Sequence, residues 1–168
     1  MSLVIEPLGK HHARGTFSSG QPELDAWFRF RASQDEKRNV TRVFVAVDTE
    51  LGVVGFYSLS SLSLAFEDLP QDIARKLPRY DAIPAALIGR LARDERVRGQ
   101  GVGELLLVDA IRRILGAGRI LAVFAIVVDA KDERALEFYK AFAFRAFPLR
   151  PNRLYLLATT AAASVGTP

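Results

Sequence analysis

The sequence predicts a single α/β (α+β) domain in which a mixed central sheet carries helices on both faces. Strand-like and helix-like segments alternate, a glycine-rich turn joins a strand to a helix, and no repeat or low-complexity linker interrupts the chain. The 168 residues are 49% hydrophobic and 25% charged, which suits one globular domain of ordinary composition. We expect the domain to span 1–160 and the tail at 161–168 to be disordered.

The first half of the chain predicts a helix, a hairpin, a short helix and a strand. Apolar residues recur at helical spacing in 24–34, and the segments 42–48 and 52–64 have the β-branched and aromatic residues of two hairpin strands. A short helix is expected around 69–80, where prolines bracket the pattern. The segment 84–94 is predicted to be a buried strand.

The second half predicts a further alternation of helix and strand. A helix begins near Val102, keeps apolar side chains three or four positions apart, and ends at the glycines of 116–118. A strand at 119–129, a helix at 131–142 and strand material at 144–159 follow. The helix from Val102 is expected to form a right-handed crossover within the sheet.

Composition excludes several chemistries. Without cysteine the chain has no disulfide, no thiolate nucleophile and no sulfur-ligated zinc, and the adjacent His11 and His12 do not by themselves make a metal site. We therefore expect no metal. The apolar run at 120–128 is roughly half of the ~20 residues that a membrane-spanning helix requires, and the N-terminus lacks the features of a secretion signal. We expect a cytoplasmic protein with no membrane span.

The basic residues are concentrated in the middle of the chain. The net charge is +4, the isoelectric point is near 9.7, and the excess is most evident between Arg75 and Arg98. A solvated basic surface is one interpretation, and a site for an anionic ligand is the other.

The stretch "RVRGQGVGELLL" at 96–107 places three glycines just before a helix. A helix N-terminus has unpaired amides and about half a positive charge, and glycine lets phosphate oxygens approach those amides. A nucleoside-triphosphate loop requires Lys-Ser/Thr after its last glycine, a dinucleotide fingerprint requires Gly-x-Gly-x-x-Gly, and neither is present. The pattern predicts a pyrophosphate site at Arg98, Gly101 and Gly103, with a merely tight turn as the alternative.

These residues resemble the acyl-CoA site of the GNAT superfamily of N-acyltransferases, whose signature is Arg/Gln-x-x-Gly-x-Gly/Ala after a strand. The segment "DERALEFYKAFAF" is similar to the second family signature, with Asp132 in place of asparagine and Ala143 in place of glycine. The resemblance implies a GNAT-like fold, whose sheet is splayed between its two middle strands, and acetyl-CoA (coenzyme A) as cofactor. It assigns cofactor binding to Leu91, Ala92, Arg93, Arg98, Gly99, Gln100, Gly101, Val102, Gly103, Glu104, Asp132 and Phe138.

A longer resemblance, over about 17–157, is to the toxin acetyltransferases of type II toxin-antitoxin modules, and "RKLPRY…IPA…GRLA" is its most specific part. It implies acetylation of the α-amine of aminoacyl-tRNA, a block of translation, inhibition by a ribbon-helix-helix antitoxin, and a homodimer. The residues then expected to bind tRNA phosphates are Arg75, Lys76, Arg79, Arg90 and Arg93, with Arg150 and Arg153 as second candidates.

Tyr139 matches the family tyrosine that gives a proton to the CoA thiolate. A phenol suits this role because it stays protonated at neutral pH and can still donate. A tyrosine packed in the core beside the apolar stripe of the same helix is the alternative. No general base is identified: Asp35 and Glu36 are possible, but solvated helix-end residues are the simpler interpretation.

Two other functions stay open. A metabolic or protein N-acetyltransferase on the same fold would act on a small-molecule amine or a peptide N-terminus. A non-catalytic CoA-binding module would bind the cofactor without turnover.

Overall fold

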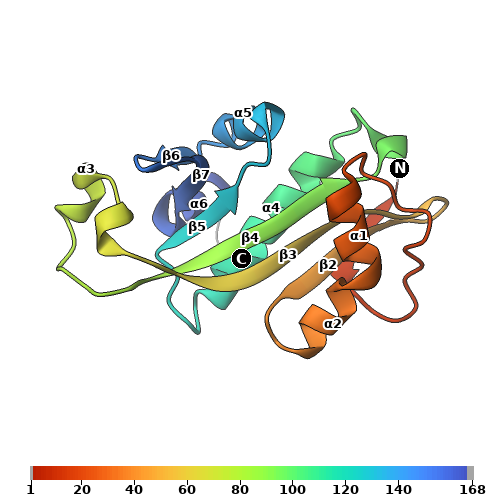
Figure 1. The fold of residues 1–168 in the computed structure, drawn as a ribbon, viewed down its shortest axis with the longest axis horizontal. Helices are drawn as coiled ribbons and strands as arrows, with labels where there is room; N and C mark the ends of the chain where they lie inside the picture. The colour runs from red at the N-terminus through yellow and green to blue at the C-terminus, as the bar shows by residue number, and fades with distance from the viewer. Residues whose placement is uncertain (1, 166–168) are drawn as a thin grey trace. The chain divides into compact units, whose positions relative to one another are not determined.

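Seven strands form a mixed sheet in the computed structural model, which describes residues 2–165 (Figure 1). Hydrogen bonding orders the strands β1-β2-β3-β4-β5-β7-β6. Backbone contacts divide the chain into a first unit, 1–60 with 89–110, and a second unit, 61–88 with 111–168. Three elements contribute residues to both units: β3 (Gly52–Leu64), β4 (Ile83–Arg93) and α4 (Val102–Ala117).

The first unit contains an antiparallel meander of β1 (Leu3–Pro7), β2 (Arg42–Asp48) and β3. The β2–β3 hairpin is the predicted one, and Asp48 closes its turn by accepting hydrogen bonds from the amides of Glu50 and Leu51. Strand β1 was not predicted, because its five residues do not alternate in hydrophobicity and it lies at the edge of the sheet.

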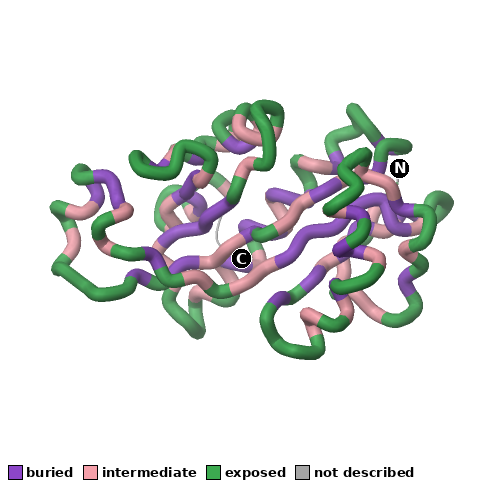
Figure 2. The backbone as a smooth tube through the Cα atoms, in the orientation of Figure 1, coloured by how far each residue is buried: buried purple, intermediate pink, exposed green. Residues whose placement is uncertain are grey.

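Helices cover both faces of the sheet in the first unit. Phe56 of β3 stacks on Phe28 of α1 (Pro22–Phe30), with ring centroids 4.1 Å apart. The next residue, Tyr57, points to the opposite face and donates a hydrogen bond of 2.5 Å to Asp109 of α4. The run of buried residues along β3 in Figure 2 therefore packs on both sides. This confirms the predicted two-sided arrangement.

The second unit continues the sheet from β4. β4 pairs in parallel with β5 (Ala125–Asp129), which agrees with the predicted crossover, and β5 pairs antiparallel with β7 (Arg150–Leu157). β7 forms a hairpin with β6 (Arg145–Phe147). The helices of this unit are α3 (Gln71–Ala74), α5 (Glu133–Ala141) and α6 (Ala158–Val165).

The helix expected at 24–34 is broken into α1 and α2 (Ala32–Lys37). The guanidinium of Arg14 donates a hydrogen bond of 2.6 Å to the carbonyl of Phe28, which a continuous helix would pair with the amide of Ala32. Arg31 then leaves the helical region with φ −121°. The contact comes from a residue 14 positions away, so local spacing could not reveal it.

Two other expectations were wrong in extent. The strand expected at 119–129 begins only at Ala125, because Ile120 and Leu121 lie in an exposed turn, at 88% and 76% exposure. The short helix expected around 69–80 is only α3. An apolar run alone does not distinguish a buried strand from a turn.

The tail is ordered further than predicted. Disorder was expected at 161–168, but α6 continues to Val165 and Ala161 is fully buried. The amide of Ala158 donates to the carbonyl of Phe124 at 2.9 Å, so α6 begins on a fixed backbone contact. Residues 166–168 lie outside the described part, and the domain boundaries at 1–160 stay a prediction.

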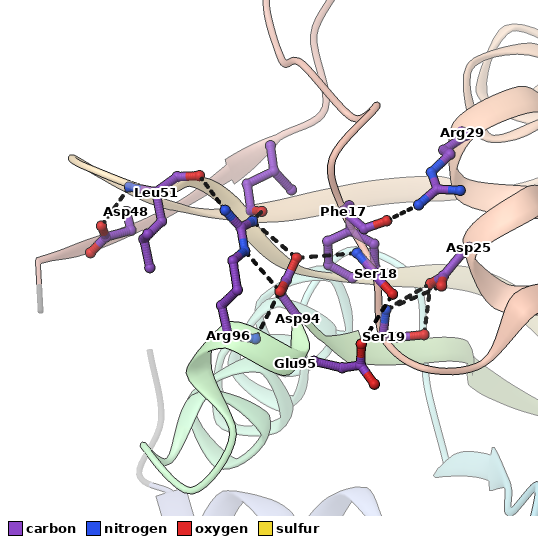
Figure 3. A network of polar contacts seen from close by, with 11 residues as sticks. Phe17, Ser18, Ser19, Asp25, Arg29, Asp48, Leu51, Asp94, Glu95 and Arg96 are labelled. Atoms are coloured by element: carbon purple, nitrogen blue, oxygen red, sulfur yellow. Dashed lines mark hydrogen bonds and ion pairs between the residues drawn. The ribbon is translucent and has the colours of Figure 1, made fainter.

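A buried carboxylate organises the turn that leaves β4 (Figure 3). Asp94 is 1% exposed and accepts hydrogen bonds from the amides of Ser18 and Arg96 and from the Arg96 guanidinium, at 2.9–3.1 Å. Burial acts to raise the pKa of Asp94, but the hydrogen bonds from Arg96 and Ser18 outweigh it, and the pKa lies below its ordinary value. Asp94 therefore ties the N-terminal loop to the residues that lead into the glycine loop.

We predict that Asp94→Asn lowers the free energy of unfolding by about 2–3 kcal/mol at neutral pH, because an amide cannot accept all these hydrogen bonds or balance the Arg96 charge. The value is moderate because the Arg96 side chain is 39% exposed to solvent. Denaturant titration measures it.

The lowered pKa of Asp94 predicts how the effect of Asp94→Asn on the free energy of unfolding depends on pH. The pKa of Asp94 is lower in the folded state than its unfolded value of about 3.9. The ionised carboxylate therefore contributes its full stabilisation above about pH 3.9, and this contribution is lost as the pH falls through the folded-state pKa. The difference between wild type and Asp94→Asn should therefore shrink below about pH 4. If the difference in unfolding free energy stayed the same below about pH 4, the ionised Asp94 carboxylate would not be the source of the stability.

Candidate active site

An exposed loop at 98–101 connects the Asp94 turn to α4. Gly99 and Gly101 have φ of +77° and +78°, in the left-handed region that residues with a Cβ rarely adopt. No atom lies within 4 Å of the position that a Cβ on Gly99 would occupy. The two glycines are therefore required for backbone conformation and not for close packing, whereas Gly103 lies inside α4.

The first turn of α4 presents amides to this loop. The bond from the Leu105 amide to the Gly101 carbonyl, 3.1 Å, opens the helix, so the amides at 102–104 precede it and have no acceptor within the helix. The side chain of Arg98 is exposed and makes no hydrogen bond or ion pair with residues 2–165. Unpaired amides, a helix N-terminus and a free guanidinium fit a diphosphate. Gln100 and Glu104, predicted with them, are exposed on the same segment.

At the end of β4, Arg90 and Arg93, which are close in sequence, lie on opposite faces of the strand. Ala92 packs in the core with Trp27 and Phe56, and side chains alternate along a strand, so Arg90 shares that face. Leu91 and Arg93 point to the opposite face. The two β4 arginines expected to contact tRNA together are thus not brought together.

Tyr139 lies on α5 in the second unit and is 7% exposed. Its ring packs against Phe138 and Phe144, with centroids 5.3 and 5.6 Å away. Burial, with a smaller contribution from the Asp129 charge, raises the pKa of Tyr139 to about 12. The phenol therefore keeps its proton across the neutral and mildly alkaline range.

Both departures from the second family signature are at the ends of α5. Asp132 is the N-cap, and its carboxylate accepts a hydrogen bond of 2.8 Å from the Ala135 amide. At the other end Ala143 has φ +70°, and the amides of Ala143 and Phe144 bond to the carbonyls of Lys140 and Tyr139. This is a Schellman motif with alanine where glycine is preferred.

We predict that Ala143→Gly stabilises the protein by about 0.5–1 kcal/mol, because glycine removes the left-handed strain at that position. Thermal unfolding at neutral pH measures it. Ala141→Gly, at the last residue of the same helix, is the control: this residue has no left-handed strain to relieve, so glycine should destabilise the protein. If Ala143→Gly lowered the stability, the backbone at Ala143 would not be strained.

The other predicted tRNA contacts lie in the second unit. Arg75, Lys76 and Arg79 follow α3 and are exposed, but Arg79 is paired with Glu67 at 2.6 Å. Arg153 binds Asp129 through two hydrogen bonds of 2.8 and 2.9 Å. Arg150 is exposed and lines a surface hollow with Arg153.

One trio of possible metal ligands occurs among residues 2–165: Glu6, His11 and His12. The Gly9 amide donates to Nδ1 of the buried His12, at 2.8 Å, so the proton of the neutral ring is on Nε2. That nitrogen faces Glu6 at 3.6 Å and would have to lose its proton to bind a metal. The geometry therefore does not favour a metal held by His12.

No helix between residues 2 and 165 combines the length and the apolar character needed to cross a bilayer.

The strand β4, a glycine loop with unpaired amides, the helix α4, the parallel strand β5 and the helix that carries Tyr139 follow one another along the chain. This order fits an acyltransferase that takes its acyl group from coenzyme A. The chain belongs to the acetyltransferase (GNAT) family, which residues 10–144 match. It is an acetyltransferase, and acetyl-CoA is its acetyl donor.

Relatives share most of the length of the chain. It is 40% identical over 151 residues to the "tRNA-acetylating toxin" of Mycobacterium tuberculosis, covering 90% of this chain and 89% of the relative. It is 32% identical over 172 residues to the "Probable toxin TacT" of Sinorhizobium fredii, covering 97% and 95%.

Two solved structures share the fold. AtaT complexed with acetyl-methionyl-tRNAfMet superposes with a TM-score of 0.89 at 24% identity, covering 96% of this chain and 98% of that one. An AtaT mutant bound to the C-terminus of the antitoxin AtaR and acetyl-CoA superposes with a TM-score of 0.81 at 21% identity, covering 97% of each.

Sequence reasoning missed the residues that support the site. Asp94 was not singled out from the sequence, although an aspartate after a strand and two positions before an arginine is a detectable turn signal. Trp27 was not singled out within the apolar pattern of 24–34 either. Asp35 is not simply a solvated helix end, because its carboxylate accepts a hydrogen bond from the Trp27 indole.

We predict that Gly99→Ala and Gly101→Ala each weaken acetyl-CoA binding at least tenfold, because the loop must leave its left-handed conformation and the amides move. Gly52→Ala is a matched control: Gly52 also has φ +77° and open space around its Cβ position, but it is the first residue of β3 and pairs with Asp48 of β2. All three should lose about 1 kcal/mol of stability, and only the loop variants should lose affinity in calorimetry. Equal affinity in all three would contradict the assignment.

Proposed function

We propose that this protein is a toxin that acetylates the α-amine of the amino acid on charged tRNA and so blocks translation. The 40% identity to a tRNA-acetylating toxin, over 90% of the chain, carries the proposal. The fold shared with AtaT, solved with an acetylated aminoacyl-tRNA, supports it. The surplus of basic residues suits a polyanionic acceptor.

The residues of the glycine loop and the β4 end would hold the cofactor, which supplies an activated acetyl thioester when bound. The amides at 101–104 and the Arg98 guanidinium would bind its diphosphate, and the backbone at 91–93 would orient the acetyl end. Gly99 and Gln100 shape the loop, whereas Asp132 and Phe138 fix α5 through the N-cap and through packing on Tyr139.

Tyr139 is the proposed general acid. Its phenolic oxygen keeps a proton that can pass to the departing sulfur. The acceptor amine needs little help from a base, because the ester of a charged tRNA withdraws electrons more strongly than a carboxylate and lowers the pKa of that amine.

The proposed partners follow from the resemblance to the toxin acetyltransferases. A ribbon-helix-helix antitoxin would inhibit the enzyme, and a homodimer in the cytoplasm would be its working form. The AtaT structure with the C-terminus of AtaR supports an antitoxin partner.

We predict that Tyr139→Phe lowers kcat for charged tRNA by about 10²-fold or more, because the departing sulfur loses its proton donor. Transfer of labelled acetyl to charged tRNA measures the rate, and calorimetry should show unchanged acetyl-CoA affinity. Tyr155→Phe is the control, because the hydroxyl of Tyr155 is buried and has no hydrogen-bond partner among the described residues. It should retain wild-type kcat.

The pH profile gives a second criterion. With a pKa of about 12, Tyr139 stays protonated, so kcat of the wild type should show no downward limb from this group between about pH 7 and 10. Wild-type kcat in Tyr139→Phe would remove the tyrosine from the mechanism. A purified enzyme that acetylates polyamines or peptide N-termini but not charged tRNA would replace the proposed function.

A further inference from the structure

The guanidinium of Arg90 is stacked on an aromatic ring of the first unit. Its central carbon lies 3.9 Å from the centroid of the Trp27 ring, which brings the planar group into contact with the indole face. Arg90 is half-buried, and burial lowers its pKa. It makes no hydrogen bond to any residue within 2–165.

The indole is itself held in place. Trp27 is buried on α1, and its Nε1–H donates a hydrogen bond of 2.9 Å to the carboxylate of Asp35 on α2. The Asp35 charge also attracts the Arg90 guanidinium. Three elements, α1, α2 and β4, thus contribute one side chain each to a fixed stack.

A guanidinium in this setting lacks partners for its edge. Stacking uses its face, whereas its five N–H groups lie in the plane and have no acceptor in the described protein. The Arg90 nitrogens are not among the buried polar atoms that lack a partner, so they reach solvent. A ligand that offers two oxygens in one plane could therefore replace water at this edge. Carboxylates and phosphates have that geometry, and the proposed acceptor, a nucleic acid, presents phosphodiesters.

We propose that Trp27 and Asp35 are positioning residues that present the edge of the Arg90 guanidinium to one phosphodiester of the charged tRNA. The inference rests on the proposed function, since a small-molecule amine would bring no such anion. Stacking fixes the long side chain before the substrate arrives, so less rotamer freedom is lost on binding.

Arg90→Gln tests the ionic contact. Affinity for aminoacyl-tRNA is measured at several salt concentrations, with Arg112→Gln on the exposed part of α4 as a control of equal charge change. We expect Arg90→Gln to weaken binding about tenfold and to reduce the slope of log affinity against log salt by about 0.7–0.9. Arg112→Gln should change neither, and acetyl-CoA affinity should be unchanged in both.

Substitutions of the two positioning residues test the support of the stack. Trp27→Phe keeps a ring but loses the N–H donor, and Asp35→Ala loses its acceptor, so each should raise KM for charged tRNA severalfold with kcat little changed. Asp35→Asn keeps an oxygen that can accept the indole N–H and should restore KM to near the wild-type value. The salt slope of all three should stay that of wild type, because Arg90 keeps its charge.

The outcomes separate this inference from the proposed function. If wild type acetylates charged tRNA but Arg90→Gln matches Arg112→Gln, the inference is wrong and the function stands. If Arg90→Gln lowers the melting temperature and the affinity but keeps the wild-type salt slope, Arg90 is a packing element and the inference is wrong. Wild type with no activity on charged tRNA would overturn both.

Discussion

The buried carboxylate of Asp94 is the constraint on which the glycine loop at 98–101 depends. It binds the Ser18 amide, 76 positions earlier in the chain, and the Arg96 amide two positions later. A backbone bond from the Glu95 amide to the Ser18 carbonyl reinforces the connection. The loop at 98–101 therefore starts from a fixed point. Glycine has the largest conformational freedom to lose, so a loop with two left-handed glycines holds one conformation only when its ends are anchored.

Tyr139, the proposed general acid, is positioned by the ends of its helix. An isolated helix as short as the nine residues of α5 is unstable in water. The Asp132 cap and the Schellman motif satisfy its terminal backbone groups, and the carbonyl of Tyr139 itself accepts hydrogen bonds from the amides of Phe142 and Phe144. The packing of Phe144 against the Tyr139 ring is the apolar contact that usually accompanies this motif. Local backbone geometry thus places the phenol, and the strain at Ala143 is small beside the contacts that this geometry allows.

The features that could be predicted from the sequence depend on short-range interactions, whereas those that could not depend on contacts between residues far apart in the chain. The glycine loop, the β2–β3 hairpin and the start of α5 rest on residues two to four positions apart, and each could be predicted from spacing. The break in the first helix depends on Arg14, the turn after β4 on Ser18, and the setting of Arg90 on Trp27, all distant in sequence. The turn at Ile120 and Leu121 was mistaken for strand because these two apolar residues are exposed. The hydrophobic pattern carries no information on which apolar side chains stay in water.

The proposed cofactor site also depends on short-range features, whereas the proposed site for the acceptor depends on long-range contacts. The groups that fit a diphosphate are mostly main-chain amides, so glycines and caps suffice to build them, and a short motif is enough to identify the reaction. The Arg90 stack needs α1, α2 and β4 to meet, and each contributes a different side chain. Arg90 and Arg93, three positions apart on one strand, face opposite sides, so charge counted along the sequence does not give charge presented to a ligand. Under the proposed function, tertiary contacts would therefore select the acceptor, and substitutions in α1 or α2 would change it while the acyl-transfer machinery stays intact.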